Sequence, residues 1–312
     1  MIEAHQLTKR YGEKTAVDRL DFTVKPGTVT GFLGPNGAGK STTMRMIIGL
    51  DAPIGGTVRV NGRRYAEHTA PLREIGALLE AKSVHPGRTA VGHLMALAHT
   101  HGIPRRRVDK VIELTGLQAV AGKRAGAFSL GMGQRLGIAA ALLGDPATVM
   151  LDEPVNGLDP EGVLWIRNLL TSLAAEGRTV FVSSHLMSEM ALVADHLIVI
   201  GRGRLLADTT VADLVRRAGG DRVKVVSADP ARLREVLAGP GVEITGRAGS
   251  EELQVTGVPA RAIGTKAAEA GIALFELTPR EVSLEDAFMD LTRDAVDYHG
   301  STTHDDTPGR AA

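Results

Sequence analysis

The sequence predicts an α/β fold with a helical insertion, followed by a smaller α+β domain. Two apolar runs, Thr148–Leu151 and Thr179–Val182, are continuous instead of alternating, which is typical of parallel strands buried on both faces. A third short run, Thr28–Leu33, leads into a glycine-rich loop and then into a helical pattern at Thr43–Ile48. This order of strand, glycine loop and helix places the loop at the edge of a sheet where α/β proteins bind their ligands.

Residues 1–219 are expected to form the first domain. The first 25 or so residues alternate apolar and polar side chains, which predicts antiparallel strands with one face in water. From about residue 87 to residue 143 helical spacing dominates. The first domain is therefore predicted to combine an antiparallel β subdomain, a parallel sheet and an inserted helical subdomain.

Residues 220–293 are expected to form an accessory or regulatory domain. The pattern changes at Gly219-Gly220, and the short runs that follow give the order β-α-β-β-α-β of a ferredoxin-like domain. The expected strands and helices are Arg222–Ser227, Pro230–Leu237, Val242–Thr245, Glu252–Val255, Pro259–Ala270 and Ile272–Leu277. A last helix, Ser283–Leu291, would have Ser283 as its N-cap. The polar tail, residues 294–312, is expected to be disordered.

The composition is that of an ordinary globular protein, with 312 residues of which 43% are hydrophobic and 23% charged. The 36 basic residues balance the 36 acidic ones, so no overall charge attracts nucleic acid or an anionic membrane. The lack of cysteine excludes disulfides and thiolate metal sites. We find no secretory signal, and the richest apolar stretch, Leu136–Leu143, is too short to cross a bilayer. We therefore expect a cytoplasmic protein that does not insert into the membrane itself.

The segment from Gly34 to Ser41 matches the pattern G-x-x-x-x-G-K-[ST]. Its glycines let successive backbone N–H groups turn inward and hold phosphate oxygens at a helix N-terminus. Lys40 would bring a positive charge to the β- and γ-phosphates, and the Ser41 hydroxyl would ligate Mg²⁺. With a strand before it and a helix after it, the segment predicts a nucleotide site formed by Gly34, Pro35, Asn36, Gly37, Ala38, Gly39, Lys40, Ser41 and Thr42.

Two adjacent carboxylates, Asp152 and Glu153, follow the strand predicted at Thr148–Leu151. Asp152 could bind Mg²⁺ directly or through water, and Glu153 could polarise an attacking water as a general base. The same residues taken alone would fit a strand that ends in a solvated acidic turn. Combined with the glycine loop, they favour a site that hydrolyses a nucleotide.

The segment Phe128–Arg135 lies between these two elements and resembles the signature motif of ABC ATPases, L-S-G-G-Q followed by x-Q-R. Leu130 and Met132 depart from that pattern, in a variant similar to those of drug and antibiotic exporters. The residues that match it are Ser129, Gly131, Gln134 and Arg135. Other family motifs are resembled in the expected order by Tyr11-Gly12 (an aromatic that stacks on adenine), Asn156–Pro160 (the D-loop) and Ser183–His185 (the switch histidine). The resemblance covers residues 1 to about 215.

The resemblance implies a homodimer that holds two ATP molecules between its subunits, with Mg²⁺ as cofactor. It implies that Ser129 and Gly131 reach the nucleotide of the opposite subunit and that Asp159 also belongs to the nucleotide site. His185 would hold the γ-phosphate and the attacking water, and Tyr11 would stack on adenine. The implied catalytic residues are Glu153, His185 and Lys40. Without the resemblance, the same residues could be a helix cap, a structural histidine and an ordinary strand tyrosine.

Glu80 follows the strand expected at Ile75–Leu79, at a position where the family usually has a glutamine. The family glutamine touches Mg²⁺ or its water and senses the permease. An ionised carboxylate still binds cations, but it cannot donate a hydrogen bond as an amide does. The resemblance therefore implies Glu80 as a metal ligand beside Ser41 and Asp152, with an altered contact to the permease. A surface glutamate without a role is the alternative.

The function implied by the resemblance is that of the ATPase subunit of an ABC transporter. It would be attached to the inner face of the cell membrane through a separate permease and would export a drug, an antibiotic or another hydrophobic compound. The alternative is a soluble ABC-type ATPase that acts on ribosomes or nucleic acid, but such proteins carry a second ATPase domain, long coiled coils or zinc-binding cysteines, which this sequence lacks. A P-loop kinase or GTPase would leave Ser129–Arg135 and His185 unexplained, and the N-K-x-D motif of GTPases is missing.

Overall fold

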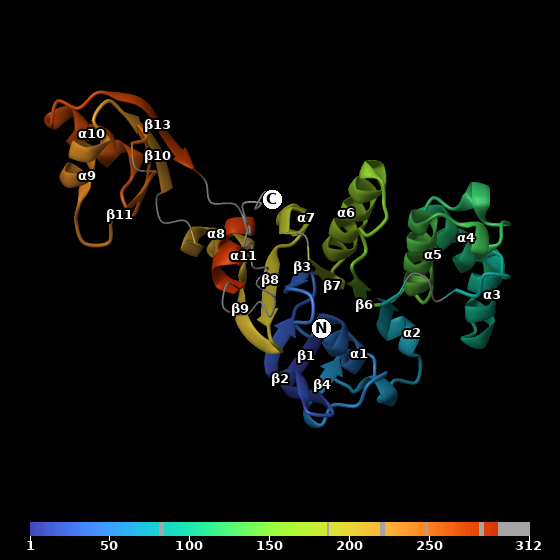
Figure 1. The fold of residues 1–312 in the computed structure, drawn as a ribbon. Coiled ribbons are helices and arrows are strands. Elements are labelled where there is room, and N and C mark those ends of the chain that lie inside the picture. Colours follow the sequence, from blue (N-terminus) through green and yellow to red (C-terminus); the bar gives the residue numbers. More distant parts are fainter. Residues whose placement is uncertain (81–83, 186, 219–221, 248, 281–283, 293–312) are drawn as a thin grey trace, which may run out of the picture.

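The structure is a computed structural model of the chain (Figure 1). It describes all residues except 81–83, 186, 219–221, 248, 281–283 and 293–312. The expected N-cap Ser283 and the tail 294–312 thus lie outside the described residues. The first domain combines an antiparallel sheet, a mainly parallel central sheet and a helical subdomain (Figure 1), as the sequence predicted.

An antiparallel sheet is formed near the N-terminus, in the order β2-β1-β4. Its strands are β1 (Ile2–Tyr11), β2 (Lys14–Val24) and β4 (Gly55–Val60). The β1–β2 hairpin runs from Ile2 opposite Val24 to Tyr11 opposite Lys14. The apolar residues of the alternating pattern are buried on one face, including Ile2, Ala4, Leu7, Leu20, Phe22 and Val24. The hairpin thus confirms the predicted antiparallel strands and brings Tyr11 to its tip.

The central sheet has the strand order β5-β6-β7-β3-β8-β9. Its strands are β3 (Val29–Leu33), β5 (Ile75–Leu78), β6 (Thr148–Asp152), β7 (Thr179–Ser184), β8 (His196–Gly201) and β9 (Arg204–Thr210). All neighbours are parallel except β8 and β9, which are antiparallel. In this register Asp152 lies opposite Ser183, and Leu33 lies opposite Ser184. The carboxyl ends of β3, β6 and β7 therefore meet at one edge, where the predicted site residues begin.

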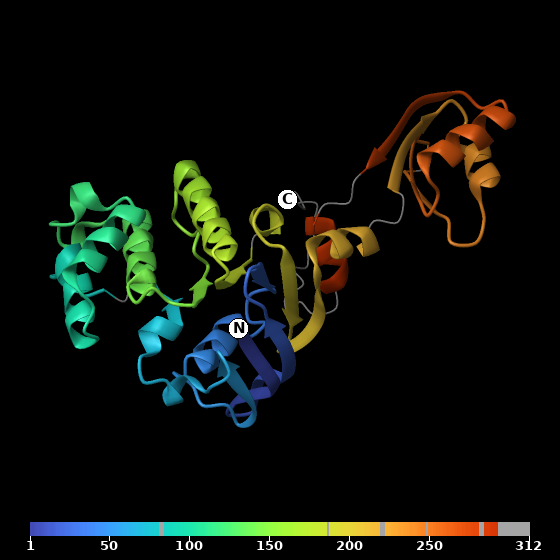
Figure 2. The same cartoon turned by 180° about the vertical axis from the view of Figure 1, so that it is seen from behind.

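Helices and an aromatic cluster fill the space around the central sheet. Phe22, Phe32 and Phe181 are buried together between the two sheets, with ring centroids 5.0–5.9 Å apart. Helix α1 (Lys40–Ile47) packs on strands of both sheets, and its buried residues share a core with the antiparallel sheet. Helix α6 (Pro160–Ala175) covers β7 and β3, and its buried residues share a separate core with the helical subdomain (Figure 2). Shorter helices of this domain are α2 (Pro71–Glu74), α7 (Met187–Ala191) and α8 (Val211–Ala218), and a 3₁₀ turn spans Tyr65–Glu67.

The helical subdomain is built from α3 (Ala90–Thr100), α4 (Arg105–Leu114) and α5 (Leu130–Leu142), with 3₁₀ turns at Gln118–Val120 and Ala125–Ala127. Leu94, Val108 and Leu136 are fully buried, one from each helix. Helix α5 also packs on β5 and β6 of the central sheet. The close contact is possible because Gly137 has no side chain: a Cβ there would lie 2.6 Å from Leu78. The signature segment at the start of α5 is thereby attached to the strands that carry the acidic residues.

The small domain has the strand order β11-β12-β10-β13, with all neighbouring strands antiparallel. Its elements are β10 (Arg222–Ser227), α9 (Pro230–Leu237), β11 (Glu243–Thr245), β12 (Glu252–Thr256), α10 (Ala260–Glu269) and β13 (Leu274–Arg280). Alternate residues such as Val223, Val225, Leu253 and Val255 are buried in a separate core with α9 and α10. This is the β-α-β-β-α-β order that the sequence predicted, with shifts of one to three residues at some boundaries.

The last described helix, α11 (Leu284–Thr292), does not join the core of the small domain. It packs against α8 and α7 of the first domain (Figure 1), and Leu284 and Phe288 are buried in the first domain's core. The sequence-based boundary had assigned residues 220–293 to the accessory domain. Burial corrects that assignment: the small domain is inserted between α8 and α11, because α11 has its apolar face on the first domain.

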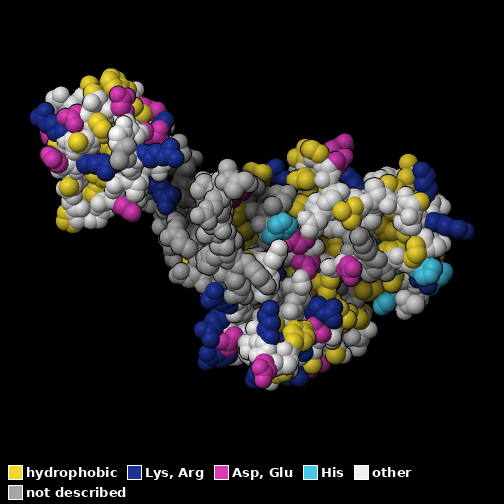
Figure 3. Space-filling view, viewed as in Figure 1, with side chains coloured by type: hydrophobic (Ala, Val, Ile, Leu, Met, Phe, Trp, Pro, Cys, Tyr) yellow, Lys and Arg dark blue, Asp and Glu magenta, His cyan; other side chains and the backbone are white. Residues whose placement is uncertain are grey.

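The surface in Figure 3 shows Lys and Arg side chains interspersed with Asp and Glu side chains on the small domain and on the lower part of the first domain. This mixture agrees with the formal net charge of zero. In the described part of the chain, no helix is long and apolar enough to cross a membrane.

Candidate functional site

The phosphate loop, the two acidic residues and Tyr11 come together at one pocket of about 460 Å³. The pocket lies at the carboxyl ends of β3 and β6, with the hairpin tip of β1 and β2 on its other side. Its lining residues are Tyr11, Lys14, Ala16, Pro35, Asn36, Gly37, Ala38, Gly39, Lys40, Ser41, Thr42, Leu79, Asp152 and Glu153. Four segments of the sequence thus form a single site.

The phosphate loop is shaped by a glycine that no other residue could replace without strain. Gly39 caps the N-terminus of α1 with φ of 105°, a value that side-chain-bearing residues avoid. A Cβ at this position would lie 2.4 Å from the carbonyl oxygen of Ala16. The hairpin strand β2 therefore presses directly on the loop, and this contact requires glycine.

Lys40 is buried in the loop, where its Nζ donates hydrogen bonds to the carbonyl oxygens of Gly34 (2.6 Å) and Pro35 (3.4 Å). Burial lowers the pKa of the Lys40 ammonium from its usual value, and the nearby carboxylates of Glu153 and Asp152 partly offset this effect. A buried ammonium that donates to carbonyl oxygens is well suited to bind an incoming anion, because the low-dielectric surroundings strengthen that attraction.

Asp152 is held between two hydroxyl groups. Ser41 donates a hydrogen bond of 2.8 Å to one carboxylate oxygen, and Ser183 donates to the other. The Ser41 hydroxyl and the Asp152 carboxylate are thus adjacent hard oxygen donors, the ligand type that Mg²⁺ prefers. These two residues fit the predicted metal site.

Glu153 has a backbone conformation that is rare for a residue with a side chain, with φ of 49°. Three contacts that involve side chains help to hold it there: its N–H donates to the Ser183 hydroxyl (3.0 Å), its carbonyl accepts from the Gln134 side chain (3.2 Å), and its carboxylate is 2.8 Å from His185 Nδ1. Such strain is sustained only where the surroundings fix the residue. The predicted base and the predicted switch histidine are therefore in direct contact.

Tyr11 lies at the mouth of the pocket, with about half of its side chain exposed. Its hydroxyl donates a 2.8 Å hydrogen bond to Asp51, which also accepts from Arg45 of α1 (2.7 Å). The hydroxyl is therefore held near the C-terminal end of α1. The ring remains accessible to a planar ligand, as its predicted role requires.

Ser129, Gly131 and Asp159 lie outside this pocket. Ser129 is the N-cap of α5, where its hydroxyl accepts from the Met132 N–H (3.2 Å), and Asp159 is the N-cap of α6. A Cβ at Gly131 would lie 2.8 Å from the carbonyl oxygen of Gly157. The signature segment and the D-loop therefore pack against each other in one chain, away from the phosphate loop of that chain.

Glu80 is exposed directly after Leu79, which lines the pocket. Strand β5 ends at Leu78, as the sequence predicted to within one residue. Glu80 therefore lies beside the pocket.

A profile described as ABC transporter matches residues 17–156 of the chain. The bacitracin transport ATP-binding protein BcrA of Bacillus licheniformis is 43% identical over 220 residues, which are 70% of this chain and 72% of the relative. The Nod factor export ATP-binding protein I of Paraburkholderia xenovorans is 35% identical over 297 residues, 93% of this chain and 96% of the relative. The chain belongs to the ABC transporter ATP-binding family.

Solved structures agree with this family assignment. An ATP-binding subunit of an ABC transporter superposes with a TM-score of 0.64 at 27% identity, over 70% of this chain and 92% of that one. The dimeric bacterial ABC transporter cassette MJ0796 superposes with a TM-score of 0.62 at 26% identity, over 67% and 98% of the two chains. Our chain is thus an ABC cassette, an enzyme that binds and hydrolyses ATP. Residues 221–285 match a separate domain of unknown function, DUF8746.

Two contributors to the cassette's site received no role from the sequence. Ser183 is fully buried and contacts both Asp152 and Glu153, and Gln134 of the signature segment holds the Glu153 carbonyl. The sequence feature that could have identified Ser183 is its position at the end of a buried strand, next to the strand that ends at Asp152. That signal depends on the pairing of β6 with β7, which only the fold supplies.

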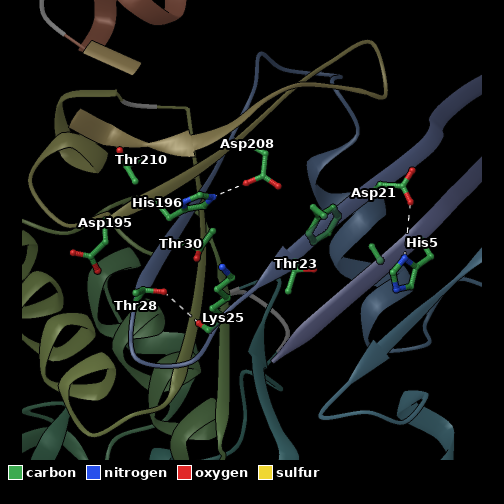
Figure 4. Close-up of a pocket in the computed structure, with 12 residues that line it drawn as sticks. His5, Asp21, Thr23, Lys25, Thr28, Thr30, Asp195, His196, Asp208 and Thr210 are labelled. Atoms are coloured by element: carbon green, nitrogen blue, oxygen red, sulfur yellow. Dashed lines mark hydrogen bonds and ion pairs between the residues drawn. The ribbon is translucent and has the colours of Figure 1, made fainter. Parts of the chain in front are cut away.

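A second cavity, of about 560 Å³, lies near the opposite end of β3 (Figure 4). It contains none of the predicted site residues. Its carboxylates already have partners in the protein: Asp21 accepts from the Gln6 backbone, Asp208 is bound to His196 at 2.5 Å, and Asp195 accepts from the Val29 N–H. The first pair links β1 to β2 within the antiparallel sheet, and the other two hold strands of the central sheet, so each carboxylate already serves its own sheet.

Proposed function

We propose that this cassette drives a separate membrane-spanning permease and that the complex exports a drug, an antibiotic or another hydrophobic compound. The observation that carries the proposal is the similarity to two exporter subunits, named for bacitracin transport and Nod factor export, at 43% and 35% identity. The cassette would then lie at the cytoplasmic face of the membrane, attached through the permease.

The contacts in the pocket support a distinct role for each of its residues. Lys40 and the backbone of the phosphate loop would hold the phosphates, and Glu153, kept in place by its backbone contacts, would accept a proton from the attacking water. His185, which is 2.8 Å from the Glu153 carboxylate, would orient the water and the γ-phosphate. Ser41 and Asp152, with Glu80 nearby, would hold Mg²⁺, which neutralises phosphate charge when bound.

The placement of the signature segment supports a site shared between two copies. Ser129 and Gly131 are outside the pocket of their own chain, and Ser129 lies exposed at the N-terminus of α5. A helix N-terminus with an exposed hydroxyl, which can still donate a hydrogen bond, and with N–H groups favours a phosphate. We propose that a second copy supplies Ser129, Gly131 and Asp159 to complete the site, so that a homodimer encloses two ATP molecules.

A groove of about 420 Å³ beside the signature segment supports a permease partner. It lies between the segment after Glu80 and the start of α5, and its lining is mainly apolar. The lining residues are Val84, Pro86, Ala125, Gly126, Phe128, Ser129, Leu130, Gly133 and Leu136. An apolar groove at this place could receive a cytoplasmic segment of the permease and couple its movement to the nucleotide site.

Site-directed cross-linking tests the proposed partner, and the cysteine-free sequence allows it to be done with single cysteines. Ala125→Cys places a photo-reactive maleimide in the groove, and Leu205→Cys on β9 provides a control at a distant surface. The tagged cassettes are irradiated on membranes from the native host. We expect Ala125→Cys alone to cross-link to an integral membrane protein. Cross-links only to ribosomal proteins or nucleic acid would favour the soluble alternative instead.

A further inference from the structure

Helix α11 connects the small domain to the part of the cassette that follows the switch histidine. Leu284 and Phe288 are one helical turn apart, and both are buried in the first domain's core. Met289, next to Phe288 on the same helix, is 66% exposed. The helix packs against both α7 and α8. One face of α11 therefore belongs to the first domain, although the small domain precedes it in the chain.

Helix α7 depends on such packing because it has only five residues, too few to be stable alone. It begins two residues after His185, and its Met187 and Met190 are buried in the same core as Phe288. On its other side, α7 lies close to the sheet: a Cβ at Gly31 of β3 would be 3.2 Å from the Met190 sulfur. Helix α7 is thus held between the central sheet and α11.

The position of α7 bears directly on the nucleotide site. His185 is at the end of β7 and contacts Glu153 at 2.8 Å, while more than a third of its side chain is exposed. His185 lies between the end of β7 and the start of α7, so the positions of these two elements bear on where its side chain lies. A shift of α7 would move His185 relative to Glu153.

We propose that Phe288 is a positioning residue for ATP hydrolysis: it holds α7 against the sheet and thereby keeps His185 in contact with Glu153. The proposal rests on the role proposed above for His185. Residues 222–280 lie in the sequence between α8 and α11, which pack against each other, so a change in the small domain can act on the first domain through these two helices. The domain of unknown function would thus influence hydrolysis through α11.

A double-mutant cycle in the full chain tests this role. ATP hydrolysis is measured with Mg²⁺ for Phe288→Ala, His185→Ala and the combined variant, with Met289→Ala as the matched control on the same helix. We expect Phe288→Ala to lower kcat about tenfold while the KM for ATP changes less than about twofold, because substrate binding does not use α7. In the His185→Ala background, Phe288→Ala should cause no further loss, since residues that act through one contact are not additive.

Amide hydrogen exchange separates failure of this proposal from failure of the proposed function. If the alanine variant does not fold, Phe288→Leu, which removes less of the buried side chain, replaces it. The substitution should accelerate exchange of the α7 amides and leave exchange of α1 unchanged. If α7 exchange is unchanged, or if the kcat losses of Phe288 and His185 variants multiply, Phe288 does not position His185. If His185→Ala hydrolyses at the wild-type rate, the assigned role of His185 fails, whatever α11 does to α7.

Discussion

Ser183→Ala offers a direct test of how the acidic pair is held. The Ser183 side chain is fully buried, donates to the Asp152 carboxylate and accepts from the Glu153 N–H at 3.0 Å. After the substitution, Asp152 keeps the Ser41 hydroxyl, and the Glu153 N–H keeps only the longer contact to the Ser183 carbonyl at 3.3 Å. One charge-assisted hydrogen bond is lost, and the strained backbone of Glu153 loses a support.

The expected loss of kcat in Ser183→Ala follows from the hydrogen bond that the substitution removes. A hydrogen bond to a charged group contributes about 1.5–3 kcal/mol, and each 1.4 kcal/mol corresponds to roughly a factor of ten in rate. If that contribution is expressed in the transition state, kcat should fall about 10- to 150-fold. The assay is steady-state ATP hydrolysis by the purified chain, with thermal unfolding measured in parallel.

The small domain supplies a matched control for Ser183→Ala. Ser227 is equally buried, but its hydroxyl contacts only backbone groups, accepting from the Asp229 N–H and donating to the Ala273 carbonyl. Ser227→Ala should lower the free energy of unfolding by about 1 kcal/mol and leave kcat unchanged. The reasoning is refuted if Ser183→Ala retains more than about a third of wild-type kcat, or if Ser227→Ala loses as much activity.

The remaining predictions concern the phosphate loop, a surface network and the core. Gly39→Ala should weaken ATP binding in calorimetric titrations far more than Gly37→Ala, because both glycines have positive φ but only a Cβ at Gly39 meets a backbone oxygen; equal losses would contradict this. The hydrogen bond from Arg45 holds the pKa of Asp51 below its usual value. The ionised Asp51 therefore stabilises the fold fully above the ordinary aspartate pKa, and this contribution is lost as the pH falls through the lowered pKa of Asp51. Asp51→Asn should therefore flatten the acid dependence of denaturant unfolding, and an unchanged slope would count against the network. Phe181→Ala should destabilise the chain by about 3–5 kcal/mol in urea unfolding, and a loss below about 1 kcal/mol would show that the aromatic cluster does not join the two sheets.

The strand and loop positions around the site could be predicted from the sequence because local signals there agree. The continuous apolar runs ending at Leu151 and Val182 became neighbouring parallel strands, and the strand before Gly34 delivered the phosphate loop to their carboxyl ends. The pattern also gave Asp152 and Glu153 in one pocket with the loop. Propensity, periodicity and loop chemistry all indicate the same arrangement in this part of the chain.

Other features depend on long-range packing that no local pattern contains. The apolar spacing of Leu284 and Phe288 indicates an amphipathic helix, but not which of two cores the helix joins. The positive φ of Glu153 arises from contacts made by Ser183 and Gln134, which are 30 and 19 residues away in the sequence. Predicting either feature requires the pairing of strands and helices, which is fixed only when the whole domain has folded.

The most direct test of the account is ATP-dependent association of Glu153→Gln, followed by light scattering with and without ATP and Mg²⁺. The substitution keeps the shape of the side chain and removes the proposed base. If Ser129 and Gly131 complete the site of a second copy, ATP should convert the monomer into a stable dimer while turnover is nearly abolished. A variant that binds ATP but stays monomeric, or one that hydrolyses ATP at the wild-type rate, would contradict the proposed shared site.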